Sequence, residues 1–335
     1  MNIFAAVLGF LSASLVTLFL TPFLIRKHYA LGIVGRDVHK PGNPVVPEVG
    51  GLAIVVGVTI GSILVALNVT TLRVHVLAFL LSFLFAAMIG LYDDLRGLKA
   101  KVKTALTVIC CTPIIIGSLL APHLITLGRP ELPLVGPLRL TIIYWVLLPF
   151  AIAVPANAVN MMDVYNGVMP GTCFFATLAL FLSGLLLGRW EAIYMSSPLL
   201  GALAAYYLYN KYPARIFSGD TGSLAVGASI GAIAVLSGLE VVGIVALMPH
   251  IMNAFHSLTS VKGLLERREI DQRPTIVLGA LLAANPDPRA PLTLANIILS
   301  KGPLPEKVLI KLYIALSVVA CVLAVLTALL MTVNI

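Results

Sequence analysis

Charged residues are scarce in this chain. Only 11% of its 335 residues are charged, whereas a soluble protein carries about 25%. Few ionisable residues lie near the middle of an apolar run, which disfavours a transporter with coupling carboxylates at the bilayer midplane. Cysteine is scarce too, and all four cysteines lie in apolar runs without metal-ligand spacing. We therefore interpret them as small core residues: Cys110, Cys111, Cys173 and Cys321.

Hydrophobic residues dominate what is present. They make up 59% of the chain, and the mean hydropathy is +1.03. A membrane-spanning helix needs about 20 mostly apolar residues, so the sequence predicts an all-α integral membrane protein with one polytopic domain, residues 1–335. Its first apolar run is too long for a signal-peptide core, and we expect a retained span. We count ten candidate spans, at 2–25, 49–67, 74–92, 103–120, 141–157, 168–188, 192–208, 221–237, 240–262 and 307–333.

Lysine and arginine are distributed unevenly between the two faces. An even number of spans puts both termini on one side, and the loops of the opposite side are 26–48, 93–102, 158–167, 209–220 and 261–306. Four of the 22 basic residues fall on the side of the termini: Arg73, Arg129, Arg139 and Arg189. The positive-inside rule therefore makes the opposite face cytoplasmic. The net charge of +8 favours lipid headgroups or a phosphorylated substrate as partners, and we expect no nucleic-acid partner.

The unusual acidic residues gather on this cytoplasmic face. They lie in its loops or at the adjoining helix ends: Asp37, Glu48, Asp93, Asp94, Asp163 and Asp220. Such a distribution favours an enzyme that takes one substrate from the cytosol and another from the lipid.

Two short motifs contain adjacent or isolated aspartates at helix ends. In LYDDLRGLKAKVK, Asp93 and Asp94 repel one another, which raises one pKa or attracts a metal, with Lys103 nearby as a counter-ion. The alternative is an ordinary solvated helix end. In SGDTGSLAVG, Asp220 precedes an apolar span, where it either caps the helix or binds a phosphate-bound metal.

Amide or carboxylate side chains recur every three residues in NAVNMMDVYNG. Asn157, Asn160 and Asp163 share one side of a helix that reaches the cytoplasmic end, and Asn166 follows. An asparagine can offer its amide oxygen to a metal or its N–H to a base or phosphate. The alternative is interhelical hydrogen bonding, which is common in membranes.

Two further loops carry charge near the membrane. In GRDVHKPGNPVVPEVGG, three prolines hold Asp37, Lys40 and Glu48 on a stiff loop, although a basic loop that only sets topology is an alternative. In the last loop, arginines can clamp phosphate oxygens or pair with neighbouring glutamates on a surface helix. These arginines are Arg267, Arg268 and Arg273.

The order of these motifs resembles the polyprenyl-phosphate N-acetylhexosamine-1-phosphate transferase superfamily over nearly the whole chain. Within it, the D-x-x-K and P-E-x-G-G elements of residues 37–51 look like the dolichyl-phosphate GlcNAc-1-phosphotransferase branch, and an archaeal origin is our interpretation. The histidine-rich loops of the bacterial branches are absent. The basic loop also departs from the R-H-R element of eukaryotic members, since this chain has ERREIDQR.

The resemblance implies ten spans, a cytosolic active site and a reaction. GlcNAc-1-phosphate would move from UDP-GlcNAc to a polyprenyl (dolichyl) phosphate with release of UMP, the first lipid-linked step of N-glycan assembly. The chain would lie in the cell membrane of an archaeon, or in the ER membrane of a eukaryote. Another UDP-N-acetylhexosamine, a role in cell-surface polysaccharide, and a nucleotide-sugar transporter remain the alternatives, and a homodimer stays open.

The resemblance also implies roles for individual residues. Asn160 and Asp220 match the ligands of Mg²⁺, for which Mn²⁺ is an alternative ion, and Lys103 matches a lysine near the pyrophosphate. Asp93 and Asp94 match the essential aspartate pair, either of which is a candidate base, and we expect a structural role for Asp163. The residues expected at the nucleotide-sugar and lipid-phosphate sites are Asp37, Lys40, Glu48, Asn166, Arg267, Arg268 and Arg273.

Overall fold

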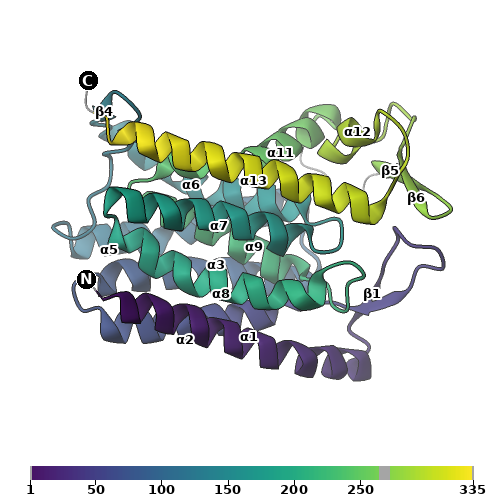
Figure 1. Cartoon of the computed structure of the whole chain (residues 1–335), viewed down its shortest axis with the longest axis horizontal. Helices are drawn as coiled ribbons and strands as arrows, with labels where there is room; N and C mark the ends of the chain where they lie inside the picture. The colour runs from purple at the N-terminus through teal and green to yellow at the C-terminus, as the bar shows by residue number, and fades with distance from the viewer. Residues whose placement is uncertain (1, 264–271, 334–335) are drawn as a thin grey trace.

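The computed structural model describes residues 2–263 and 272–333, and most of them are helical (Figure 1). Two of the predicted site residues, Arg267 and Arg268, lie outside the described residues. The longer helices are α1 (Ile3–Leu31), α2 (Gly51–Asn68), α3 (Arg73–Arg96), α6 (Ile142–Met162), α7 (Val168–Leu187), α8 (Trp190–Asn210), α9 (Gly219–Leu236) and α13 (Glu306–Met331). The shorter ones are α4 (Ala100–Val108), the 3-10 turn η1 (Ile109–Cys111), α5 (Thr112–Leu120), α10 (Glu240–Ala246), α11 (Met248–Ser260) and α12 (Leu294–Leu299).

The protein is a multi-pass membrane protein with many apolar helices. Within the described residues, eight helical segments are long and apolar enough to cross a membrane, with α4, η1 and α5 together forming one of them. The count is nine if α10 and α11, which meet at a 68° bend, form one broken span. The predicted total of ten is not confirmed. The remaining segment, 192–208, is helical in α8, but its tyrosines and serines leave it less apolar than the others.

Short strands occur only between the apolar helices of the described chain. Three small antiparallel sheets pair β1 (Val34–Arg36) with β2 (Val45–Pro47), β3 (Glu131–Leu132) with β4 (Gly136–Pro137), and β5 (Thr275–Leu278) with β6 (Leu281–Ala284), which also pairs with β7 (Leu304–Pro305). The all-α prediction therefore holds for the spans, whereas the long loop 261–306 also contains strands and α12.

Helix α9 is the most buried of the candidate spans. Its N-terminal end meets α2 and α3 so closely that backbone touches backbone. A Cβ atom on Gly51 would lie 2.3 Å from the backbone nitrogen of Gly222, and one on Gly90 would lie 2.2 Å from the carbonyl oxygen of Asp220. Both glycines are required here because any side chain would push α2 or α3 away from α9.

The two ends of the helical bundle differ in character. Figure 1 shows both chain termini at one end, and β1, β5, β6 and α12 at the opposite end. The C-terminal ends of α3 and α6 and the N-terminal ends of α9 and α13 belong to the second end, and they carry the acidic and amide residues discussed below.

Candidate functional site

Lys103 bridges two carboxylates that are far apart in the sequence. Its ammonium lies 2.9 Å from an oxygen of Asp93, in the last turn of α3, and 2.7 Å from an oxygen of Asp220, in the first turn of α9. The Lys103 and Asp93 side chains are only 12% and 10% exposed, and that of Asp220 is 25% exposed. Partial burial strengthens such contacts relative to those of a surface pair.

Asn160 completes this group from α6. Its amide nitrogen donates to the second carboxylate oxygen of Asp220 at 2.8 Å and to the Ser223 hydroxyl at 2.9 Å. We define the carboxylate cluster as Asp93, Asp94, Lys103, Asn160 and Asp220. These five residues were all predicted as site residues, and the structure brings them together from four helices.

Asp94 caps the helix that carries Asp220. Its carboxylate oxygens accept from the backbone N–H groups of Asp220 at 2.8 Å and Thr221 at 2.9 Å, and from the Thr221 hydroxyl at 2.6 Å. A carboxylate here satisfies otherwise unpaired N–H groups and stabilises the positive end of α9. Gly219 has a φ of 67°, and a Cβ atom on it would lie 2.6 Å from Asp94 Oδ2. Glycine is therefore required both by conformation and by space.

Asp163 ends α6 and begins the turn toward α7. Burial raises the pKa of its carboxyl to about 7, and the nearby negative charge of Asp94 adds to the increase. No role in the carboxylate cluster follows from its contacts, so its expected structural role stays a prediction.

Asn160 and Asp220 are chemically suited to Mg²⁺. The ion usually keeps several waters and takes one or two protein carboxylates plus substrate phosphates. One carboxylate and one amide oxygen meet that need, although the Asn160 amide must turn to direct its oxygen instead of its nitrogen toward the ion. Among residues 2–263 and 272–333, no group of three or more His, Cys, Asp or Glu residues could hold a metal by itself. The metal therefore stays a prediction.

A second polar group surrounds Lys40. Its ammonium donates to the Asp37 carboxylate and to the Asn166 side-chain oxygen, and it lies 3.4 Å from a Glu306 carboxylate oxygen. Asn166 in turn donates to Asp37 at 3.1 Å and accepts from the backbone N–H of Ala214 at 2.8 Å. Asp37, Asn166 and Glu306 are each buried. We name these four residues, Asp37, Lys40, Asn166 and Glu306, the Lys40 network.

Glu306 and Tyr212 were missed in the sequence analysis. Glu306 is the first residue of α13, and Lys40 also lies over the Tyr212 ring, 4.7 Å from its centroid. A carboxylate at the start of a long apolar helix is a usable signal, because a helix N-terminus favours negative charge. Nothing local in the sequence indicates that Tyr212 faces Lys40.

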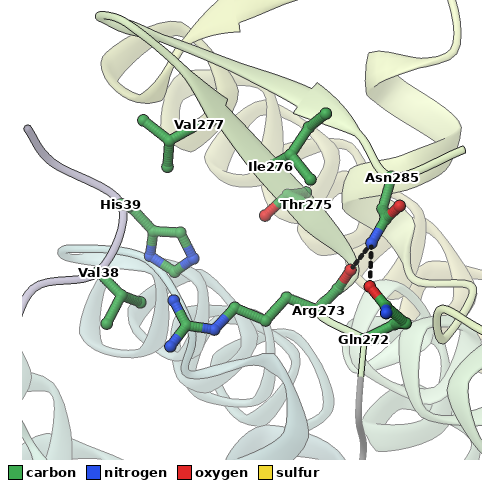
Figure 2. Close-up of a pocket in the computed structure, with 8 residues that line it drawn as sticks. All are labelled: Val38, His39, Gln272, Arg273, Thr275, Ile276, Val277 and Asn285. Carbon is green, nitrogen blue, oxygen red and sulfur yellow. Dashed lines mark hydrogen bonds between the residues drawn. The ribbon is translucent and has the colours of Figure 1, made fainter. Parts of the chain in front are cut away.

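The remaining described candidates, Glu48 and Arg273, lie near the same end. Glu48 is exposed after β2, and a Cβ atom on Gly35 would collide with its carboxylate. Arg273 lines an open depression of about 340 Å³ between the loop after β1 and strand β5, with Asn285 also in its lining (Figure 2). Figure 2 shows its guanidinium directed toward His39, whose ring contacts Tyr165 at a centroid distance of 4.7 Å. The depression therefore adjoins the Lys40 network through residues 37–40.

Together, the apolar helices and the carboxylate cluster define a multi-pass helical membrane protein with an acidic polar site at one end. A family model described as glycosyl transferase family 4 matches residues 76–238. That segment contains every member of the carboxylate cluster.

Individual relatives extend the match over most of the chain. A Saccharolobus solfataricus protein is 30% identical over 267 residues, which cover 78% of this chain and 81% of the relative. It is provisionally named a UDP-N-acetylglucosamine–dolichyl-phosphate N-acetylglucosaminephosphotransferase, as is a Sulfolobus acidocaldarius protein that is 30% identical over 66% of this chain and 67% of its own length. A phospho-N-acetylmuramoyl-pentapeptide-transferase of Halalkalibacterium halodurans is 28% identical over 71% of this chain and 76% of its own. The chain belongs to glycosyl transferase family 4, which confirms the resemblance drawn from its motifs.

Proposed function

We propose that the protein transfers GlcNAc-1-phosphate from UDP-GlcNAc to a polyprenyl phosphate of the dolichyl type and releases UMP. The observation that carries this proposal is the carboxylate cluster, in which Lys103, two aspartates and an asparagine from separate helices meet at one end of a membrane bundle. The names of the two archaeal relatives supply the sugar and the lipid. The product would be dolichyl diphosphate–GlcNAc, the first lipid-linked intermediate of N-glycan assembly.

The reaction joins two anions. An oxygen of the lipid phosphate attacks the β-phosphorus of UDP-GlcNAc, and the bond from that phosphorus to the UMP oxygen breaks. Positioning and charge stabilisation are the main catalytic demands of phosphoryl transfer. Lys103 supplies fixed positive charge where negative charge develops. A Mg²⁺ ion held by Asn160 and Asp220 would add positive charge that offsets the repulsion between the phosphates.

The two adjacent aspartates have different surroundings, which bears on the choice of a base. Both oxygens of Asp94 are occupied by donors of α9. Asp93 accepts from Lys103 and from the backbone N–H of Leu98. Direct attack by an ionised lipid phosphate needs neither residue as a base. We favour that route, and a radiolabelled phospho-enzyme trapped without acceptor lipid would contradict it.

The decisive experiment uses purified protein in detergent with Mg²⁺ and defined polyprenyl phosphates. UMP release is measured for UDP-GlcNAc, UDP-GalNAc and UDP-N-acetylmuramoyl-pentapeptide, with and without lipid. Lipid-dependent UMP release with UDP-GlcNAc supports the proposal. Preference for another UDP-sugar would favour one of the alternative transferases, including one for cell-surface polysaccharide. Release of no UMP from any donor, together with transport in proteoliposomes, would favour a nucleotide-sugar transporter.

A further inference from the structure

Lys103 is carried by a helix with little apolar anchorage. Among the nine residues of α4, only Thr107 is buried, and the cap residue Lys99 makes no capping side-chain bond. The buried cysteines of η1 anchor only the C-terminal end of this segment. Burial therefore does not explain why the end that carries Lys103 lies against Asp93 and Asp220.

One amide on α6 bonds to two hydroxyls of α4. The Asn157 nitrogen donates to the Thr107 hydroxyl at 2.8 Å, and the Thr104 hydroxyl donates to the Asn157 oxygen at 3.2 Å. The Thr107 hydroxyl also donates to the Thr104 carbonyl at 2.7 Å, and Asn157 donates to the Ala153 carbonyl at 2.8 Å. We name Asn157, Thr104 and Thr107 the amide clamp. It fixes both the rotation and the height of α4 on α6, because the two hydroxyls are three residues apart on one helix side.

Helix α6, which carries Asn157, packs against the backbone of α9. A Cβ atom on Gly227 would lie 2.4 Å from the carbonyl oxygen of Pro155, and one on Gly231 would lie 2.3 Å from that of Ala151. Helices α6 and α9 therefore pack backbone against backbone, and Asp94 ties α3 to α9. Of the four helices that carry the carboxylate cluster, α4 has the fewest buried residues.

We propose that Asn157 is a positioning residue that holds Lys103 at Asp93 and Asp220. Asn157 lies three residues before Asn160 on α6, and its partner Thr104 directly follows Lys103 on α4. The clamp thus places the ammonium level with the Asn160–Asp220 pair. The kinetic consequence rests on the proposed function, in which Lys103 meets charge that develops during phosphoryl transfer.

The kinetic test compares variants of the clamp in detergent-purified protein. Asn157→Ala and Thr107→Val should each lower kcat by about 10- to 100-fold, because small displacements of a catalytic group cost rates of that order. The KM for UDP-GlcNAc should stay within about twofold, since a transition-state contact is lost rather than substrate binding. Thr107→Ser keeps the hydroxyl and should retain kcat. Tyr144→Phe is the matched control, since it removes a 2.6 Å bond from α6 to Glu240 at the other end of the helix.

A double-mutant cycle separates positioning from general destabilisation. If Asn157 acts through Lys103, Asn157→Ala should have little further effect on kcat in a Lys103→Ala background. An equal loss in both backgrounds, or a kcat loss with Thr107→Ser as large as with Thr107→Val, would overturn the proposal.

Thermal unfolding in detergent gives a second readout that needs no activity. Lys103→Met should lower the unfolding midpoint less in Asn157→Ala protein than in the unmodified protein. In the Asn157→Ala protein the Lys103 ammonium is already displaced and contributes less to stability. Equal decreases would contradict the clamp, whatever reaction the enzyme performs. If Asn157→Ala does reduce the effect of Lys103→Met on the unfolding midpoint but the protein releases no UMP, the proposed function is wrong and the clamp is correct.

Discussion

The backbone N–H of Asp220 donates to the side chain of Asp94 at 2.8 Å, so the helix that carries Asp220 begins on a carboxylate of another helix. This contact joins residues 126 positions apart in the chain. The two neighbouring aspartates therefore make different contacts. Asp93 accepts a hydrogen bond from the Lys103 ammonium, whereas Asp94 caps the N-terminal end of α9.

Replacement of Asp94 by asparagine should displace Asp220. One of the two carboxylate oxygens becomes an NH₂ group that faces N–H donors, so a cap bond is lost and a donor is placed against donors. Loss of a helix cap costs about 0.5–2 kcal/mol, and the lost interaction with the helix dipole adds to it. We expect a lower unfolding midpoint together with a loss of turnover. Unchanged values for both, by thermal unfolding and UMP release, would show that Asp94 does not position α9.

Alanine at Asn160 or Asp220 should abolish Mg²⁺-dependent turnover while the protein still folds and inserts. Both changes remove an oxygen donor that we assign to the cation. The measurement is UMP release over a Mg²⁺ titration, with size-exclusion chromatography as the test of folding. Ser223→Ala is a matched control because Ser223 contacts Asn160 but is not a proposed ligand. Near-normal Mg²⁺ dependence in either alanine variant contradicts the metal assignment.

Removal of the Lys103 charge should tighten metal binding even though it slows catalysis. The ammonium lies 2.7 Å from Asp220, so it repels a divalent ion on the same carboxylate. We expect Lys103→Met to bind Mn²⁺ at least about tenfold more tightly, which corresponds to about 1.4 kcal/mol. Lys103→Arg keeps the charge and should show no such gain. Calorimetry without substrate measures this directly, and weaker Mn²⁺ binding by Lys103→Met would be the opposite of the expected result.

Loss of Glu306 should affect substrate binding more than catalysis. Its carboxylate lies 3.4 Å from Lys40, which also contacts Asn166, a proposed nucleotide contact. Glu306→Gln removes the charge but keeps an acceptor for the Asn166 N–H. We expect a several-fold higher KM for UDP-GlcNAc with kcat within about twofold. Glu306→Ala should also lower the unfolding midpoint. A lower kcat with an unchanged KM would show that the Lys40 network does not contribute to nucleotide binding.

The predicted cytosolic orientation of the site can be tested by labelling. All four native cysteines are buried, which also confirms their interpretation as core residues. Cysteine introduced at the exposed Asn43, on the loop between β1 and β2, should react with an impermeant maleimide only after the cells are opened. Cysteine at Val135, between β3 and β4, should react in intact cells. The reverse pattern would place the carboxylate cluster on the external side.

The sequence determined the class of this protein and singled out every member of the carboxylate cluster. Hydropathy accumulates over about 20 neighbouring residues, so it locates spans without knowledge of their packing. It also predicted the break between the spans 221–237 and 240–262, which the structure places at residues 237–239, between α9 and α10. Motif order identified the family and singled out Asp93, Lys103 and Asp220 as residues of interest.

The tertiary structure alone decided which of these residues meet and which contacts they make. Lys103 and Asp220 are 117 positions apart in the chain. The sequence alone left two interpretations of Asn157, a ligand or an interhelical hydrogen bond, and the structure shows it bonded to Thr104 and Thr107. Glu306 is recognised as a member of the Lys40 network only from its contact with Lys40 in the structure. Such contacts depend on the rotation and height of each helix, which are set by close contacts such as that of Gly90 with Asp220. Rotation and height are relations between distant segments, and local composition does not encode them.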